Sequence, residues 1–446
     1  MASSKRKRYW LGPRAVALVA LGLSLGTITS AVASDAQAVL AVPARPSIDR
    51  GAFAHYGHLA FISEGALWVL DGASGRLTLL ATSNQQPSDG QFSPDGRWLI
   101  YSVGSGKVWL ARSDGSSPRA VARAGRDGWL PNGELLAGRA VWQVSGSGSL
   151  TRVGELPNDL VAWSPGWDRF AFESDSLVIS HTKPSTGTDR LQVSSSLTGT
   201  RTTWYESKVS FANFSGAQGN FLDRIVVLPN KQGLLFTLDP DLSSSLAADG
   251  LGLYEVRAPG GPATNLGVTV GDTVTVGADG AFAFTNGPDR YAWLTKSVVA
   301  CSSATAKVGD STPDCSPIRS LHGELSFDPA LSPNGHVLAF VEAPSNSATN
   351  FFQATVQRWY ASHSLWVLRA ASSSPVEVKD ANGASAPVWS ADGKSLMYVA
   401  DDALWLLPSV SSRPVRIASP LFQRNDWPSY FGQVDWSGQF TWSSPS

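Results

Sequence analysis

The chain has 446 residues and a formal net charge of −1, with 35 Lys and Arg against 36 Asp and Glu, which argues against binding to nucleic acid. Only 16% of the residues are charged and 43% are hydrophobic, so the chain is too apolar for a disordered protein. The 42 Gly, 27 Pro and 17 Trp favour short strands and tight turns over long helices, and two Cys cannot form a thiolate-rich metal site.

The N-terminal residues 1–33 have the features of an export signal. Residues 5–8 are cationic, residues 15–28 are uncharged and apolar, and small residues at 31–33 offer a cleavage site. The alternative is an uncleaved membrane anchor, because the uncharged stretch extends to residue 33. In both cases we expect the rest of the chain to be secreted, periplasmic or at the cell surface, with no other contact to a membrane. Residues 34–54 are predicted to be a linker.

One short pattern recurs from residue 56 to the C-terminus. Its clearest copy is Phe92-Ser93-Pro94-Asp95-Gly96, which is followed by the apolar residues of a second strand. Pro fixes φ at an early turn position, Asp or Asn accepts local backbone hydrogen bonds, and Gly tolerates positive φ, so each copy predicts a β-hairpin. Eight such turns follow residues 92, 129, 163, 227, 276, 331, 389 and 436.

A second landmark indicates four strands in each repeat. An aromatic or branched residue marks a third strand 13–17 positions after a turn, at Trp109, Trp142, Val178, Trp293 and Trp405. The pattern predicts an all-β protein with a single closed β-propeller of four-stranded blades at residues 55–446. Eight blades are expected and seven are the alternative. A C-terminal strand at residues 433–437 is predicted to complete the N-terminal blade and so close the ring.

Repeats of this form resemble TolB-like propellers and the WD-repeat-like propellers of exported bacterial proteins. They also look like the propellers that precede the hydrolase domain in relatives of prolyl oligopeptidase. The resemblance covers residues 56–446 and implies the fold, because the repeated residues build turns and core. In TolB itself a helical domain precedes the propeller and supports its partner contacts. Only a short linker stands before the repeats here, so those partners are not carried over.

Two connections between second and third strands, at residues 239–252 and 343–364, are longer than the others. Antiparallel strands return both connections to the same face of a propeller. Aromatic and Arg side chains on loops often anchor binding surfaces, which makes the longer connection the main candidate. The alternative is that its aromatic residues pack on the rim and cap the core. The candidate ligand-binding residues in this connection are Phe351, Phe352, Arg358, Trp359, Tyr360 and His363.

The shorter connection adds two acidic candidates. Asp239 and Asp241 flank a proline, and their carboxylates either bind a ligand such as a cation or form a turn with solvated charges. A third insertion, at residues 181–220, is rich in Ser and Thr and is predicted to form an extra hairpin or to be partly disordered.

The two cysteines, Cys301 and Cys315, flank a loop rich in small and polar residues. In an exported protein this arrangement predicts a disulfide, and a redox switch is the alternative.

Motifs of catalysis and cofactor binding are absent from the sequence. It contains no H-E-x-x-H, no G-x-S-x-G and no Gly-rich phosphate loop, so no catalytic residue, metal or cofactor is assigned. We expect a monomeric, non-enzymatic propeller that binds a protein or a cell-envelope ligand through loops on one face. The alternative is a propeller enzyme, such as a glycosidase, lyase or lactonase, with polar residues converging at the central channel.

Overall fold

The computed structural model describes most of the chain after the predicted export segment. The described residues are 43–104, 106–123, 127–175, 185–212, 216–229, 233–270, 273–302, 314–318, 324–346, 353–370, 374–421, 436 and 438–445. Residues 1–42, which contain the predicted export signal, lie outside them. The described part of the chain is all-β, with 54% of its residues in strands and 5% in helices.

The described strands form six sheets, and all of the pairings among them are antiparallel. The first sheet is β33 (Phe440–Ser443), β2 (His58–Ser63), β3 (Ala66–Asp71) and β4 (Leu77–Ala81). The second is β5 (Pro87–Phe92), β6 (Trp98–Val103), β7 (Lys107–Arg112) and β8 (Arg119–Arg123). The third is β9 (Gly128–Trp129), β10 (Leu135–Ala137), β11 (Ala140–Val144) and β12 (Leu150–Glu155).

The largest sheet has 12 strands because neighbouring repeats are joined edge to edge. It contains β13 (Leu160–Trp163), β14 (Phe170–Asp175), β15 (Ser185–Ser194), β16 (Thr202–Ala212), β17 (Gly216–Val227), β18 (Leu234–Pro240), β19 (Leu251–Val256), β20 (Thr264–Thr269), β21 (Thr275–Val276), β22 (Phe282–Asn286), β23 (Ser297–Ser302) and β24 (Asp314–Pro317).

Two further sheets complete the chain. One is β25 (Leu325–Leu331), β26 (Val337–Ala343), β27 (Ser364–Arg369) and β28 (Val376–Asn382). The other is β29 (Ser385–Trp389), β30 (Leu396–Ala400), β31 (Ala403–Leu407), β32 (Val415–Ser419) and β1 (Ser47–Ile48). The helices are the 3₁₀ turn η1 (Ser83–Gln85) and the α-helices α1 (Ser244–Asp249) and α2 (Gln353–Ala361).

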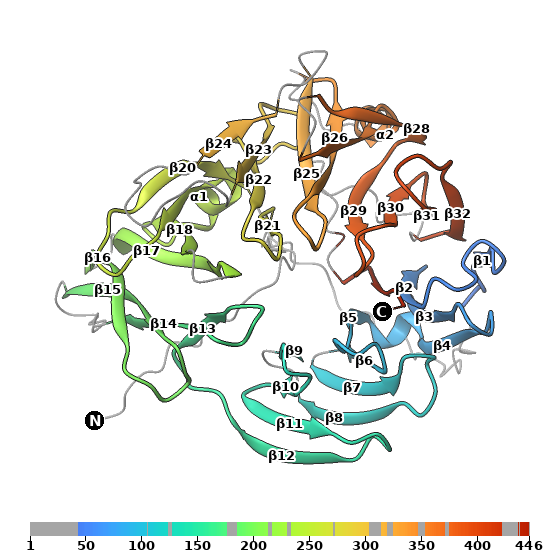
Figure 1. Ribbon diagram of the computed structural model, residues 1–446, viewed down its shortest axis with the longest axis horizontal. Coiled ribbons are helices and arrows are strands. Elements are labelled where there is room, and N and C mark those ends of the chain that lie inside the picture. Colours follow the sequence, from blue (N-terminus) through green and yellow to red (C-terminus); the bar gives the residue numbers. More distant parts are fainter. Residues whose placement is uncertain are drawn as a thin grey trace, which may run out of the picture.

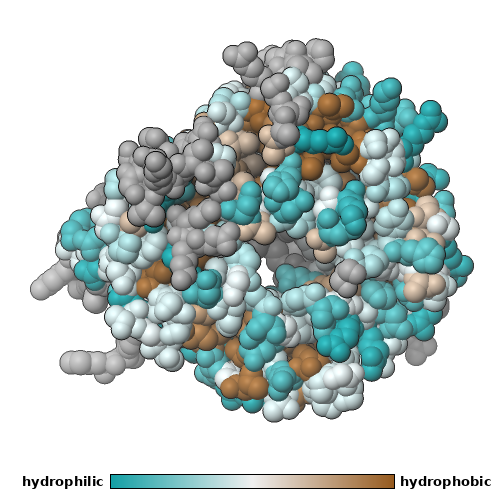
Figure 2. All heavy atoms as spheres, in the orientation of Figure 1, coloured by the Kyte–Doolittle hydropathy of each residue, from teal (hydrophilic) through white to brown (hydrophobic). Residues whose placement is uncertain are grey.

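The sheets are arranged around a central opening, with β5, β9, β21 and β29 among the strands closest to it (Figure 1). The space-filling view shows the same opening between the described residues (Figure 2). This is the β-propeller architecture that the repeats predict.

The repeated turn residues make the same hydrogen bonds in different repeats. After β5, Ser93 Oγ donates to Asp95 Oδ1 (2.6 Å) and accepts from the backbone N–H of Trp98 (3.0 Å). The same pair of bonds recurs in the turns that follow β25 and β29. Gly96 closes the turn at a φ of +66°, where a side chain would be strained. The repeated Ser, Asp and Gly therefore build turns.

Tryptophans at the end of the motif strand tie neighbouring sheets together. The indole Nε1 of Trp129 donates to the carbonyl of Gln91 in the preceding sheet (3.2 Å). In the same way, Nε1 of Trp389 donates to the carbonyl of Ala330 (2.8 Å). In both cases the acceptor is the residue just before the motif position of the preceding repeat, which explains why this position favours Trp over a purely apolar residue.

The third-strand landmark is correct in most repeats and wrong in one. Trp109 in β7, Trp142 in β11 and Trp405 in β31 lie on third strands and are half-buried, as packing residues should be. Trp293 lies in the connection before β23, because that connection is longer than a tight turn and the strand begins only at Ser297. Val178 lies outside the described residues.

The C-terminal strand pairs with the N-terminal sheet, but six residues later than expected. Trp442 in β33 lies opposite Leu59 of β2, just as Trp389 lies opposite Leu396. The position that corresponds to Trp389 is therefore Trp442, and not Trp436 as the sequence pattern indicated. A turn in which the N–H of residue 439 bonds to the carbonyl of residue 436 precedes the strand.

The N-terminal end of the described chain packs on the last sheet. Ser47 and Ile48 form β1, which pairs with the outer strand β32. Phe53 is fully buried in a cluster that contains Leu59 of the first sheet and Leu406 of the last. The second half of the predicted linker, from residue 47 onward, is thus packed against both end sheets.

Candidate functional site

Three successive connections between second and third strands carry the insertions. The β18–β19 connection contains α1, and the β26–β27 connection contains α2. Between them in sequence, the β22–β23 connection spans residues 287–296. The corresponding connections at residues 64–65, 138–139 and 401–402 have only two residues. The long connections are therefore grouped in three neighbouring repeats.

Arg290 joins the first two insertions. Its Nη2 donates to Asp249 Oδ2 (2.5 Å) and to Ser245 Oγ (2.9 Å), and its Nε donates to Asp249 Oδ1. The hydrogen bonds from Arg290 hold the pKa of Asp249 below its usual value. The backbone N–H of Asp289 also donates to the carbonyl of Asp249 (2.8 Å). The end of α1 is therefore fixed to the β22–β23 connection.

The buried side chain of Lys296 stabilises the β22–β23 connection, of which it is the last residue. Its Nζ donates to the carbonyls of Asp289 (2.8 Å), Leu294 (2.9 Å) and Tyr291 (3.2 Å). Burial lowers the pKa of Lys296 to about 8, so the side chain is still cationic at neutral pH. A buried ammonium with three backbone acceptors explains how ten irregular residues keep one conformation.

Aromatic packing joins the same connection to α2. The rings of Trp293 and Trp359 meet edge to face with centroids 6.1 Å apart. The N–H of Asn346 donates to the carbonyl of Trp293 (3.1 Å), and Trp359 Nε1 donates to the carbonyl of Pro344 (3.0 Å). We call the resulting continuous surface the crescent, defined as residues 239–250, 287–296, 344–346 and 353–363.

Long strands of the 12-stranded sheet continue the crescent towards the preceding repeat. β15, β16 and β17 have 10, 11 and 12 residues and pair with one another in sequence order. The N–H of Asp241 donates to the carbonyl of Gly219 in β17 (3.1 Å). In the described residues the third insertion therefore consists of long strands of the sheet, and whether it also forms an extra hairpin stays a prediction; residues 176–184 and 213–215 lie outside the described residues.

Trp359 and Tyr360, the predicted aromatic binding residues that the structure describes, are buried beneath the surface of the crescent. Trp359 and Tyr360 are buried in a cluster with Phe327 and Trp293, so α2 covers the core as in the alternative that the sequence left open. Arg358 is exposed. Phe351 and Phe352 lie outside the described residues. A ligand-binding role for these residues stays a prediction, and the buried rings act as support for the surface above them.

His363 is enclosed by this aromatic cluster. It is 1% exposed, and its ring lies 4.3 Å from the ring of Trp359 and 5.1 Å from that of Phe327, measured between centroids. Its Nδ1 donates to the carbonyl of Ala384 (3.0 Å), which assigns the hydrogen to Nδ1. Burial lowers the pKa of His363 to about 3, so the imidazole is neutral in the folded protein.

The buried imidazole makes stability sensitive to acid. Because the unfolded chain binds a proton at His363 below about pH 6.5 and the folded chain does not, acid favours unfolding between that pH and about 3. We expect the free energy of unfolding of the wild type to fall more steeply over this range than that of His363→Gln. Denaturant titrations at several pH values test this, and parallel curves for the two proteins would contradict it.

Asp239 and Asp241 lie at the start of the α1 connection. Asp239 Oδ1 accepts from the N–H of Ser243 (3.1 Å), and Asp241 is exposed. Burial raises the pKa of Asp239, and repulsion by Asp223 and Asp241 adds to this effect. The two predicted acidic residues are thus brought together on the crescent, and whether they bind a ligand stays a prediction.

Sequence reasoning missed two leucines beside these acids. Leu242 and Leu246 are 39% and 40% exposed, and they are the large apolar side chains that the described crescent leaves most open. Leu242 also has a φ of +51°, directly after Asp241 at +69°. A bulky residue in this left-handed region is strained, and such strain is found at functional sites. The available signal was two leucines in an otherwise small and polar insertion.

Asp328 is a second residue that sequence reasoning missed. It lies at a bulge in β25, and its Oδ2 accepts from the N–H of Ala386 in β29 (3.2 Å). Burial raises the pKa of this carboxyl. The bond joins two neighbouring sheets, so its clearest role is structural. The bulge that places it there leaves no mark in the sequence pattern.

Cys301 and Cys315 form the predicted disulfide. They lie directly opposite each other in β23 and β24, so the bond links two paired strands at the start and end of one loop.

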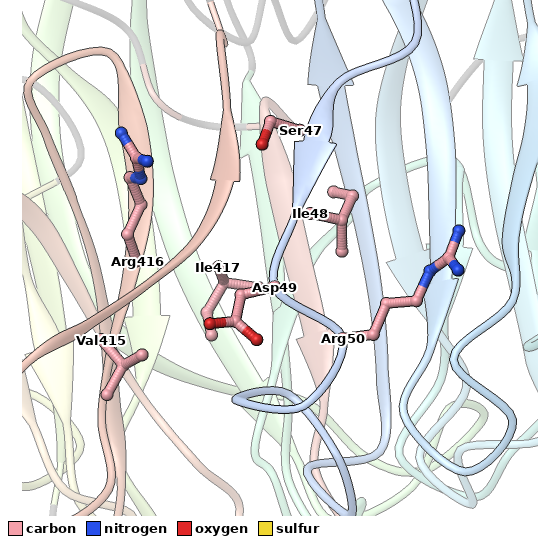
Figure 3. Close-up of a pocket in the computed structure, with 7 residues that line it drawn as sticks. All are labelled: Ser47, Ile48, Asp49, Arg50, Val415, Arg416 and Ile417. Carbon is pink, nitrogen blue, oxygen red and sulfur yellow. The ribbon is translucent and has the colours of Figure 1, made fainter.

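Two hollows lie away from the crescent. One of about 530 Å³ lies between residues 47–50 and 415–417, where Arg50 and Arg416 extend away from each other (Figure 3). The other, of about 260 Å³, is lined by apolar residues of β13, β17 and β21 and the adjacent turn. Among the described residues, no group of three His, Cys, Asp or Glu is placed to hold a metal ion. None of the helices in that part of the chain is long and apolar enough to span a membrane.

Comparison with known proteins yields structural likenesses only. No family model and no curated protein matches the chain. An oligogalacturonate lyase in complex with manganese shares 12% identity at a TM-score of 0.36, covering 81% of this chain and 84% of its own. TolB from Acinetobacter baumannii shares 14% identity at a TM-score of 0.33, covering 85% and 86%.

A third solved structure, the dipeptidyl peptidase 4 of Porphyromonas gingivalis, shares 9% identity at a TM-score of 0.41. The match covers 84% of this chain and 59% of the peptidase, so the chain spans little more than half the length of that enzyme. These similarities, at identities of 9–14% and TM-scores below 0.5, assign neither a family nor an activity.

Proposed function

We propose that this chain is an exported, non-enzymatic β-propeller that binds a protein of the cell envelope through the crescent. The observation that carries the proposal is the joining of three successive insertions into one surface. Folding a blade does not need them, because other repeats make the same connection with two residues. Insertions held together by specific contacts are a common way to build a binding surface on a repeat scaffold.

The proposal includes eight blades in a ring closed by β33. Four-stranded groups follow from the strand order when the 12-stranded sheet is divided before β17 and before β21. The division before β21 is supported by the single residue pair, Thr269 with Asn286, that joins β20 to β22. The pairing of β33 with β2 supports closure, because it gives the first sheet its fourth strand.

The proposed location outside the cytoplasm has two supports. The basic and apolar order of residues 5–33 is that of an export segment. The disulfide between Cys301 and Cys315 is of a kind that persists in oxidising compartments and is rare in the cytosol.

The leucines provide the test. In the double variant Leu242→Ser, Leu246→Ser we expect capture of a partner from the envelope fraction to fall at least about tenfold, or about 1.4 kcal/mol, since two exposed apolar contacts are lost. Both leucines are on the surface, so the melting temperature should stay unchanged.

A matched control uses exposed apolar residues elsewhere. Val153 in β12 and Val376 in β28 are 49% and 63% exposed and lie on outer strands away from the crescent. The double variant Val153→Ser, Val376→Ser should capture the partner as well as the wild type does. Equal capture by all three proteins would exclude the crescent as the binding surface.

A further inference from the structure

An apolar and acidic patch occupies the α1 end of the crescent. We call it the α1 patch and define it as Leu242, Leu246, Asp239 and Asp241. Ser243 caps α1, with its Oγ accepting from the N–H of Leu246 (3.4 Å), while its own N–H donates to Asp239 (3.1 Å). These two bonds place the Asp239 carboxylate beside the leucine-bearing turn. Two exposed leucines, the exposed Asp241 and the half-buried Asp239 thus lie within eight residues of the chain.

The nearby cations balance the charge of the patch only in part. Residues 239–252 contain three Asp and no Lys or Arg. Asp249 is one of these three, and its carboxylate accepts hydrogen bonds from Nε and Nη2 of Arg290. Arg224 Nε lies 3.5 Å from Asp223 Oδ2, and burial raises the pKa of Asp239 more than the charge of Arg224 lowers it. Among the described residues, no salt bridge reaches Asp239 or Asp241.

Charge and apolar surface together indicate what the patch receives. We propose, on the basis of the binding function proposed above, that the α1 patch takes a segment of the partner protein in which apolar side chains are flanked by Lys or Arg. The leucines contribute contact area, and the cations of the segment are attracted to Asp239 and Asp241. This is the complementarity by which amphipathic segments are recognised and by which wrong partners are rejected.

A pair of synthetic peptides tests the chemistry on the full chain. Both have the same length and leucine content, and one carries Lys and the other Glu at the polar positions. We expect the Lys peptide to bind, with affinity falling at least about tenfold between about 50 and 500 mM NaCl as salt screens the carboxylates. The Glu peptide should not bind.

Two double variants separate the charges from the leucines. Asp239→Asn, Asp241→Asn keeps an oxygen acceptor for Ser243 and should weaken binding of the Lys peptide about tenfold at low salt, with little difference left at high salt. The double variant Leu242→Ser, Leu246→Ser should weaken binding of the Lys peptide at both salt concentrations. The control variant Val153→Ser, Val376→Ser should bind the peptide as the wild type does at both.

The outcomes distinguish this inference from the proposed function. Equal binding of the two peptides, or Lys-peptide binding unaffected by the Asp variants, would overturn the inference. Peptide binding that requires added Ca²⁺ and is lost with EDTA would also overturn it, because the patch would then be a cation site. So would loss of peptide binding when the chain self-associates, because the patch would then be covered by a second copy of the chain. Envelope capture that depends on the leucines but not on the acids would leave the proposed function standing without the inference.

Discussion

A chain ended at Gly438 should lose about 3–5 kcal/mol of its free energy of unfolding, because it lacks β33. This strand supplies the fourth strand of the first sheet and packs Phe440 and Trp442 against the cluster shared by the end sheets. Trp442 Nε1 also donates to the carbonyl of Tyr56 (2.6 Å). Removing it exposes the edge of β2, which favours aggregation as well as unfolding.

The matched control ends the chain at Ser444. It keeps β33 and the bond from the N–H of Ala391 to Ser444 Oγ (2.8 Å), and should match the full chain in thermal unfolding. Should the chain that ends at Gly438 not fold at all, Trp442→Ala gives a smaller loss in the same direction. An unchanged melting temperature for both the shorter chain and Trp442→Ala would exclude a role for this strand in closing the fold.

Phe53→Ala should cost about 3–5 kcal/mol, the usual effect of removing a fully buried aromatic side chain. Phe53 is 0% exposed and contacts the cluster that contains residues of the first and last sheets. The effect should appear in the midpoint of denaturant unfolding with little change in the slope, since the same surface is exposed on unfolding.

Arg50→Ala is the control for this prediction. Arg50 is exposed in the same segment, so its loss should change stability by no more than about 0.5 kcal/mol. A segment that only linked the export signal to the propeller would tolerate both substitutions equally. Equal stability of Phe53→Ala and the wild type would therefore show that residues 47–54 do not hold the end sheets together.

The fold could be predicted from the sequence because its signals are local. The turn formed by Ser93, Asp95 and Gly96 is encoded by adjacent residues, and so the repeats and their strands were recognisable. The register of the C-terminal strand could not be predicted in this way. Trp436 and Trp442 both precede a serine, so the local pattern does not distinguish between them. The choice is made by pairing with β2, almost 400 residues earlier, and hence by a contact distant in sequence.

The candidate site was predictable in position but not in detail. The lengths of the insertions at residues 239–252 and 343–364 marked the part of the propeller in which the crescent lies. Their aromatic content did not reveal that Trp359 and Tyr360 face inward, because an apolar ring serves a core and a binding surface equally well. The exposure of Leu242 depends on two consecutive left-handed residues, which is a property of the folded backbone.

Site-specific cross-linking tests most directly whether the crescent is the binding surface. A benzophenone side chain is placed at Leu246 on α1 in one protein, and at exposed Asn334, in a turn that follows a motif strand, in another. Such turns lie at the opposite ends of the strands from the crescent connections. After irradiation in the envelope, we predict a partner adduct from position 246 and none from position 334. An adduct from position 334 alone, or equal adducts from both, would contradict binding through the crescent.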